Sequence, residues 1–403
     1  MTTTTGSPLD LHRVRSQFPA LRDGTAYFDG PGGSQTPRCV AHAVAATLGA
    51  GLSNRGTVTA SERRADEVVR AARAAVGDLL GADPGGVVFG RSMTQLTFDL
   101  ARALAKQWGP GDQVVVTRLD HDANIRPWVL AAEAAGATVR WVDFDPGTAE
   151  LSFDPEVLSE RTRLVAVTGA SNLLGTRPDV SAIAAATHEA GALLYVDGVH
   201  LTPHAPVDVA ALGADLFACS SYKFFGPHLG MVAAAPSLLE RIDNDKLRPA
   251  TTAVPERFEL GTLPYEMLAG VTAAVDFLAD LVPGQGSRRD RVLASMRALE
   301  ETEEALFRRL LGGLRSLERV RTYGTPSRRT PTVLFTVEGV PPGVVYEQLA
   351  ARGVNAPASS FYAIEAAQWI GLGPEGAVRA GLAPYTSEDD VDRLLAGVAA
   401  VAG

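Results

Sequence analysis

Short polar clusters follow a series of apolar runs in the first half of the chain. They stand at 92–94 (Ser-Met-Thr), 120–122 (Asp-His-Asp), 171–172 (Ser-Asn), 197–200 (Asp-Gly-Val-His) and 220–223 (Ser-Ser-Tyr-Lys). Together they offer hydroxyls, carboxylates, imidazole rings and a lysine amine. Hydroxyls at the start of a helix can hold a phosphate, and a lysine amine can bond covalently to a carbonyl carbon. One cluster alone is weak evidence, but their succession indicates one shared site.

The apolar runs before these clusters are short and often β-branched, as buried parallel strands are. Strands are predicted at 87–90, 114–117, 138–144, 164–168, 192–196, 216–219 and 231–235, with helices at 62–80, 94–108, 124–135 and 180–190. Strands that alternate with helices predict a parallel sheet covered on both faces. Ligands of such sheets bind beyond the carboxyl ends of the strands. We therefore expect an α/β fold in which the polar clusters converge at one sheet edge.

A Pro-Gly-Gln-Gly break at 283–286 separates this region from a second unit. Beyond the break, the pattern predicts a smaller α+β domain with a long charged helix at 291–311, strands near 332–336 and 378–382, and a last helix at 388–401. We expect an N-terminal segment at 1–25 that packs on the small domain, a large domain at 26–283 and a small C-terminal domain at 284–403.

Composition argues against several classes of protein. The chain has 403 residues, 46% of them hydrophobic, which is enough for a large core and a second domain. A net charge of -9 without basic runs disfavours a nucleic-acid partner, and no apolar stretch approaches the roughly 18 residues of a membrane span. The polar start lacks the regions of a signal peptide and there are only two cysteines, so a cytoplasmic location is expected. His200 and His204 are spaced like metal ligands, but Pro203 disfavours a shared helix face and no metal is expected.

The polar clusters match what pyridoxal 5′-phosphate (PLP) needs from a protein. The cofactor requires a lysine that forms its Schiff base, a carboxylate that keeps the pyridine nitrogen protonated, and a ring that stacks on its face. Its phosphate requires hydroxyls and a helix N-terminus. The clusters contain all of these groups. The chain has no GxxxxGK(S/T) sequence, which disfavours a nucleotide phosphate site.

The chain resembles the fold-type I, class V aminotransferase superfamily, and within it the cysteine desulfurase-like branch. The resemblance is carried by 27–37 (YFDGPGGSQTP), 120–128 (DHDANIRPW), 171–176 (SNLLGT), 197–200 (DGVH), 220–223 (SSYK), 257–262 (RFELGT) and 385–391 (YTSEDDV). These segments span nearly the whole chain. The resemblance implies the PLP fold type I, with a mostly parallel seven-stranded sheet in the large domain. It also implies a homodimer with shared active sites that acts on a small amino-acid substrate.

The resemblance assigns a role to each matched residue. Lys223 is the Schiff-base lysine and proton shuttle, Asp197 pairs with the pyridine nitrogen, and His121 stacks on the ring. Four further residues are implied at the cofactor phosphate: Thr94, Ser220 and Tyr222, with Met93 where a hydroxyl residue is common. Asn172 would lie beside the cofactor and the substrate, and His200 would contact the phenolic oxygen in place of a glutamine. Thr262 would reach the phosphate of the neighbouring subunit. The substrate contacts implied are Arg379, which would bind the carboxylate bidentately, together with Asn172, Arg55 and Tyr362.

Structural roles remain open for several of these residues. Asp197 could cap a helix, and His121 could be an ordinary turn residue. Arg379 could form a plain ion pair, and Arg55 could lie on a solvated loop. Sequence alone leaves these alternatives standing.

One part of the desulfurase pattern is absent from this chain. Persulfide-forming members need a cysteine on a C-terminal loop, and the matching segment 353–362 (GVNAPASSFY) contains none. Cys219 falls in a predicted core strand and Cys39 in the N-terminal region, so neither is expected to carry sulfur. We therefore expect a PLP-dependent C–S lyase that acts on cysteine, a cysteine conjugate or a sulfoxide without a protein persulfide. Cysteine desulfurase, amino-acid epimerase and aminotransferase activities, and PLP binding without turnover, are the alternatives.

Overall fold

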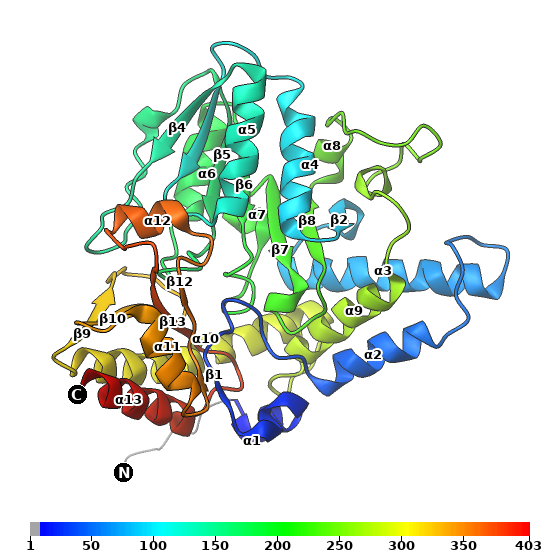
Figure 1. Ribbon diagram of the computed structural model, residues 1–403. Helices are drawn as coiled ribbons and strands as arrows, with labels where there is room; N and C mark the ends of the chain where they lie inside the picture. Colours follow the sequence, from blue (N-terminus) through cyan, green and yellow to red (C-terminus); the bar gives the residue numbers. More distant parts are fainter. Residues whose placement is uncertain (1–8) are drawn as a thin grey trace.

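A seven-stranded sheet forms the centre of the larger part of the molecule in the computed structural model, which describes residues 9–403 (Figure 1). Its strand order is β2-β8-β7-β6-β5-β3-β4. The bounds are β2 Val87–Gly90, β3 Gln113–Thr117, β4 Thr138–Val142, β5 Thr162–Thr168, β6 Leu193–Asp197, β7 Leu216–Ser220 and β8 Gly230–Ala234. Neighbouring strands are parallel except β8, which runs antiparallel to β7 and β2. These are the predicted strands, and the mostly parallel α/β sheet is confirmed.

Strand residues alternate between two hydrophobic cores, one on each face of this sheet. Val114 and Val116 of β3 belong to the core under α4 (Met93–Ala105) and α5 (Arg126–Ala135). Val115, between them, belongs to the core that contains residues of α3, α6 and α9. The bounds of these helices are α3 Ala60–Leu80, α6 Val180–Glu189 and α9 Tyr265–Ala279. Successive side chains of a strand point to opposite faces, so helices on both sides bury the whole apolar run.

A four-stranded antiparallel sheet, in the order β12-β13-β10-β9, forms the smaller part of the molecule. Three helices pack against it: α10, α11 and α13. The bounds are β9 Val320–Tyr323, β10 Thr332–Val337, β12 Ala358–Ser359, β13 Ala377–Gly381, α10 Arg288–Arg315, α11 Pro342–Ala350 and α13 Glu388–Ala402. The predicted charged helix, both predicted strands and the last helix are all present in this α+β unit.

Helix α1 (Leu11–Ser16) contacts both parts of the molecule. Arg15 forms an ion pair with Asp390 of α13 at 2.7 Å, whereas Val14 and Phe18 belong to the core on the α3 and α9 side of the large sheet. The predicted domain boundaries stay predictions, and residues 1–8 of the N-terminal segment lie outside the described residues. The remaining elements are β1 Ala26–Tyr27, β11 Val354–Asn355, α2 Arg38–Leu48, α7 Val209–Leu212, α8 Pro236–Leu239 and α12 Ile364–Trp369. No helix among residues 9–403 is long and apolar enough to cross a membrane.

The antiparallel strand β8 brings the start of α4 to the edge where the parallel strands end. Gly230, the first residue of β8, lies opposite Gly90 of β2 and Ser220 of β7. A Cβ atom on Gly230 would lie only 2.1 Å from the backbone nitrogen of Met93, so only glycine permits this approach. The N-terminus of α4 is therefore held directly beside the carboxyl ends of the neighbouring strands.

Candidate active site

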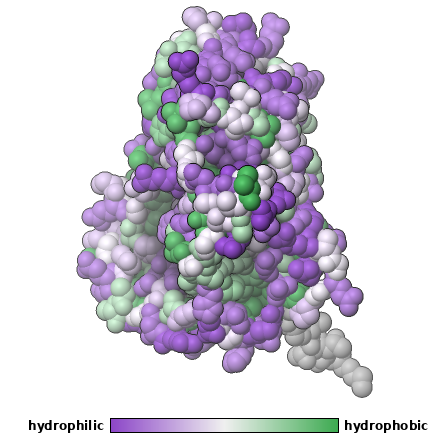
Figure 2. Space-filling model, turned by 90° about the vertical axis from the view of Figure 1, so that its right-hand side faces the viewer, coloured by the Kyte–Doolittle hydropathy of each residue, from purple (hydrophilic) through white to green (hydrophobic). Residues whose placement is uncertain are grey.

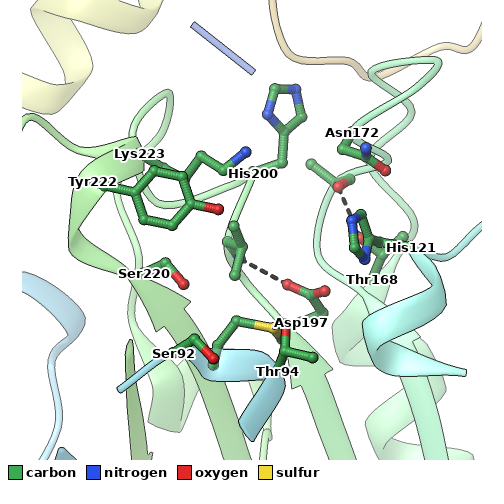
Figure 3. Close-up of a pocket in the computed structure, with 13 residues that line it drawn as sticks. Ser92, Thr94, His121, Thr168, Asn172, Asp197, His200, Ser220, Tyr222 and Lys223 are labelled. Atoms are coloured by element: carbon green, nitrogen blue, oxygen red, sulfur yellow. Dashed lines mark hydrogen bonds between the residues drawn. The ribbon is translucent and has the colours of Figure 1, made fainter. Parts of the chain in front are cut away.

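A cavity with about 520 Å³ of empty space, its open mouth included, lies at this edge of the sheet (Figure 3). Most of its lining consists of residues predicted to contact the cofactor. They are Met93, Thr94, His121, Asn172, Asp197, His200, Ser220, Tyr222 and Lys223, and the lining is completed by Ser92, Thr168, Ala170 and Val199. Of the predicted cofactor contacts, Thr262 alone lies elsewhere. The fold thus brings together residues that are separated by up to about 130 positions in the sequence because the strands that precede them are parallel.

Lys223 and Asp197 occupy neighbouring strand ends in this cavity. The Lys223 amine donates a hydrogen bond to the carbonyl oxygen of Pro31, and burial, followed by the nearby Arg379, lowers the pKa of Lys223 to about 7. Asp197 accepts a hydrogen bond on Oδ1 from the backbone nitrogen of Val199 at 3.0 Å, and burial raises the pKa of this carboxyl to about 6. A protonated ring nitrogen in the cavity would favour the charged form of Asp197.

His121 presents an uncharged ring to the cavity. Its Nδ1 accepts a hydrogen bond from the backbone nitrogen of Ala123 at 3.0 Å, so the hydrogen of the neutral ring lies on Nε2. Burial, with Lys223 and Arg379 nearby, lowers the pKa of His121 to about 4. Its ring stacks on that of Tyr362, with centroids 5.7 Å apart and planes at 28°. A neutral, flat ring of this kind suits stacking on an aromatic cofactor.

Asp120 belongs to a buried network next to His121. Its carboxylate accepts hydrogen bonds from the Thr117 hydroxyl and from Nδ2 of Asn124, the latter at 2.7 Å. Oδ1 of Asn124 accepts in turn from the Trp128 indole at 3.1 Å. Burial raises the pKa of Asp120 to about 8. This network fixes the short turn that carries His121, a role that the sequence reading did not assign to Asp120.

Hydroxyls and a helix N-terminus gather at the lower end of the cavity in Figure 3. Ser92 caps α4 by accepting a hydrogen bond from the backbone nitrogen of Gln95 at 3.1 Å, so it is a helix cap as well as a lining residue. Thr94, Ser220 and Tyr222 place their side chains in the same lining. The positive end of a helix dipole beside several hydroxyls is a suitable site for a phosphate.

This set of donors and acceptors fits PLP. It provides an amine, an opposing carboxylate, a neutral ring and a phosphate site in one cavity. Figure 3 shows Lys223 and Tyr222 on one side, His121 and Asn172 on the other, and Asp197 between them. The arrangement can hold a planar, phosphorylated ring with a charged nitrogen.

His200 is fixed by residues from the smaller part of the chain. Its Nε2 makes hydrogen bonds of 3.0 Å with the hydroxyls of Thr330 and Thr332. Its ring meets that of His204 edge-on at 5.1 Å, and His204 pairs with the buried Glu303 at 2.9 Å. Within residues 9–403 no group of three or more histidines, cysteines or carboxylates is placed to hold a metal ion. The hydrogen bonds of His200 and the His204–Glu303 pair form a polar link between the two parts of the molecule.

A second cavity continues from the first and contains the predicted substrate contacts Arg379, Asn172 and Tyr362. Arg379 is buried, its Nη1 donates to the carbonyl oxygen of Asn172 at 2.9 Å, and its guanidinium lies 3.7 Å from the centroid of the Phe361 ring. Burial lowers its pKa to about 9, and its Nε has no hydrogen-bond partner among residues 9–403. These features suit a guanidinium that receives a substrate carboxylate more than one in a structural ion pair.

The loop that carries Tyr362 is a fixed wall of this second cavity. Phe361 and Tyr362 have φ angles of 53° and 57°, a region that costs non-glycine residues about 1–3 kcal/mol each. Two hydrogen bonds from the large part hold the loop: Nδ2 of Asn172 donates to the Phe361 carbonyl at 3.0 Å, and the backbone nitrogen of Asp122 donates to the Tyr362 carbonyl at 2.7 Å. These hydrogen bonds restrain the backbone of the loop at Phe361 and Tyr362.

Two predicted contacts lie outside both cavities of this chain. The guanidinium of Arg55 forms ion pairs with Asp66 at 2.9 Å and Glu256 at 3.0 Å, so it is not on a merely solvated loop. Thr262 is exposed. As contacts made to a neighbouring subunit, both residues stay predictions.

Several lining residues were not found from the sequence. They are Pro31, Gly32, Phe98, Ala123, Arg126, Thr168, Ala170, Val199, Ser359 and Phe361. A signal existed for six of them. Five lie inside segments that carry the family resemblance, namely Pro31, Gly32, Ala123, Arg126 and Val199, and Phe98 lies one helical turn after a polar cluster.

Comparison with known proteins identifies the relatives of this chain. The family model described as Aminotransferase class-V matches residues 26–394. An uncharacterized protein of Mycobacterium tuberculosis is 38% identical over 97% of this chain and 99% of its own length. Aminotransferase-like protein FGM3 of Gibberella zeae is 32% identical over 96% of this chain and 98% of its own length. Among solved structures, the cysteine desulfurase CsdA of Escherichia coli is 26% identical, with a TM-score of 0.84 over 96% of this chain and 97% of its own.

Proposed function

This chain belongs to the class V aminotransferase family of PLP-dependent enzymes, in its cysteine desulfurase-like branch, and from that premise we propose that it is a C–S lyase. Its substrate is cysteine, a cysteine conjugate or a cysteine sulfoxide. Loss of the Cα proton and cleavage of the Cβ–S bond, followed by hydrolysis, release pyruvate, ammonia and the sulfur-containing group. No protein persulfide takes part in this reaction.

One observation carries this proposal: the first cavity brings together nine of the ten residues predicted to contact PLP, but neither cavity contains a thiol. Cys219 is fully buried in β7, and burial raises the pKa of its thiol far above the usual range. Cys39 lies on α2 and lines neither cavity. A sulfur-accepting cysteine must be an accessible thiolate, and neither residue satisfies both conditions at the site.

The residues around the site divide the work of the reaction. Bound PLP supplies an electron sink for the charge left on Cα when its proton is removed. Nζ of Lys223, which lines both cavities, removes that proton. Arg379 orients the substrate by its carboxylate, and the restrained loop at Phe361 and Tyr362 closes the opposite wall.

The double variant Cys39→Ser/Cys219→Ser tests whether sulfur passes through the protein. We expect it to retain pyruvate release within about twofold of wild type per folded molecule, because neither thiol reaches the substrate. Pyruvate is measured with cysteine, cystine, S-alkyl cysteines and their sulfoxides. Cys219→Ala controls for packing, since a buried hydroxyl at this position costs about 1–3 kcal/mol. A persulfide on either cysteine, with loss of turnover in the double variant, would instead support a desulfurase. Recovery of the amino acid with inverted configuration at Cα would indicate an epimerase. Conversion of the cofactor to its pyridoxamine form would indicate an aminotransferase.

We also propose a homodimer, on the basis of one exposed face of the molecule. The α2–α3 connection and the segment 243–262 project on the right-hand side of Figure 1, the side that faces the viewer in Figure 2. Large apolar side chains in these segments are exposed: Leu48, Val58, Leu247 and Leu260. If a second copy covers this face, Thr262 of one subunit would lie near the cofactor cavity of the other subunit, as the family resemblance implies.

Thr262→Ala is expected to release PLP about tenfold faster than wild type, because a hydroxyl bonded to a charged phosphate is lost. The release rate is followed by the visible absorption of the cofactor during dilution, and sedimentation reports the oligomeric state. Thr252→Ala, at another exposed threonine of the same segment, serves as the control. A fully active monomer with unchanged PLP release in Thr262→Ala would rule out the shared site.

A further inference from the structure

The second cavity is larger than a cysteine side chain needs. Its empty space, including the mouth, is about 1170 Å³. It shares Thr94, His121, Asn172, Tyr222 and Lys223 with the cofactor cavity. The rest of its lining comes from residues 31–32, from Phe98 of α4, from the turn at 122–123 and the start of α5, from residues 359–362 and from Arg379 of β13. The cavity therefore has room beyond the cofactor and the backbone of an amino acid.

Two residues at the inner end of the second cavity, Arg379 and Lys223, fix the direction of a bound substrate. Arg379 holds the carboxylate, and Lys223 must reach the Cα hydrogen. Arg379 is buried and Lys223 is half-buried. The substrate side chain must then contact the outer wall of the cavity. There Phe98 and Tyr362 supply aromatic surface and Arg126 supplies a positive charge.

Arg126 lies at the mouth of the cavity, with its side chain 45% exposed. Its Nη2 lies 3.3 Å from Oδ1 of Asp122, four residues earlier. An exposed ion pair of this length and spacing contributes well under about 1 kcal/mol, so it does not prevent the guanidinium from turning to another anion. The mouth thus combines aromatic walls with a cation that can bind a carboxylate of the substrate.

We propose that the preferred substrates are cysteine conjugates whose sulfur bears an apolar or aromatic group that ends in a carboxylate, which Arg126 binds. This inference rests on the proposed lyase activity and narrows its substrate class. Cleavage of the same Cβ–S bond then releases a carboxylate-bearing thiol together with pyruvate and ammonia.

A matched pair of substrates tests the role of Arg126: S-(4-carboxybenzyl)-L-cysteine and its neutral isostere S-(4-carbamoylbenzyl)-L-cysteine. For wild type, we expect kcat/KM for pyruvate release to favour the carboxylate about tenfold. In Arg126→Gln this ratio should fall to near one. Arg140→Gln, at an exposed arginine of the edge strand β4 outside both cavities, should keep the wild-type ratio.

Calorimetric binding of the same two compounds to Lys223→Ala holoprotein measures the preference without turnover. The dissociation constants should show the same preference for the carboxylate and lose it when Arg126→Gln is added. Equal binding of the two compounds before this second change, or an unaltered preference after it, would overturn the proposed role of Arg126. If neither cysteine nor any S-substituted cysteine or sulfoxide yields pyruvate, the lyase proposal fails, and the binding ratio still decides whether Arg126 selects an anion.

Discussion

Lys223→Ala is expected to bind PLP without a covalent bond and to lose on the order of 10⁴-fold or more of the activity. The change removes both the covalent anchor and the base that moves the Cα proton, and a positioned base alone is worth about 10²–10⁴-fold. In wild type, borohydride should fix the cofactor to the single peptide that contains Lys223. The visible absorption band and mass spectrometry of the labelled peptide provide the measurement. Recovery of the label on another lysine would contradict the assignment.

The pH dependence of cofactor capture provides a second check on Lys223. A neutral amine is the attacking species, and the pKa of Lys223 is lowered to about 7. Covalent capture of PLP by the cofactor-free protein should therefore rise with pH through about 7 and then level off. An unperturbed lysine would keep gaining reactivity up to about pH 10. Lys106→Ala, at a surface lysine that pairs with Asp245 at 2.8 Å, should leave the profile unchanged.

Asp197→Asn is expected to lose about 10²–10³-fold of the activity while keeping the fold. An amide cannot stabilise a protonated pyridine nitrogen by its charge, and each unit by which the ring pKa falls corresponds to about 1.4 kcal/mol. The asparagine oxygen can still accept the hydrogen bond from the backbone of Val199, so the strand end stays in place. The measurement is kcat together with the pH titration of the cofactor band. Wild-type turnover in this variant would mean that another carboxylate serves the ring.

Stability measurements separate loss of charge from loss of structure in this variant. Burial raises the pKa of Asp197 in the folded protein to about 6, above the value of this carboxyl in the unfolded chain. The stability that the protonated Asp197 contributes is therefore fully present below about pH 4 and is lost as the pH rises through about 6. Cofactor-free Asp197→Asn should therefore melt at a higher temperature than wild type at pH 7.5, and this advantage should shrink toward pH 4. Asp215→Asn is the matched control, because its carboxylate also accepts a backbone hydrogen bond next to β6, from Leu194 at 2.8 Å.

Local sequence patterns were sufficient for much of the fold. Short β-branched runs marked the strands of the large sheet because burial on both faces requires apolar side chains at every position. The 15-residue helix α9 was missed for a related reason. It packs against α2, α3 and α10 together, so it lacks the polar stripe that makes a surface helix recognisable. A helix that is enclosed on all sides therefore gives no amphipathic period in its sequence.

The chemical content of the site also followed from the sequence. Polar residues after parallel strands must meet at one sheet edge, and this rule alone predicts that Lys223, Asp197 and His121 lie together, as they do in the first cavity. The segments that carry the family resemblance assigned a role to each of these three residues. The absence of a cysteine from 353–362 was equally visible in the sequence, and it directed the functional proposal away from persulfide chemistry.

Tertiary structure alone decided how these groups are held and what they face. The ion pairs of Arg55, the two threonine hydroxyls on His200 and the backbone bonds that fix Tyr362 all join positions far apart in the chain. The contacts of His200 and Tyr362 depend on how the small sheet packs against the large one, and no local pattern encodes that packing. The outer wall of the second cavity, which includes Arg126, also depends on packing between distant segments. The sequence by itself determined which reactive groups the protein contains and at which edge they meet, whereas their orientation, protonation and reach depend on long-range packing and burial that only the folded chain provides.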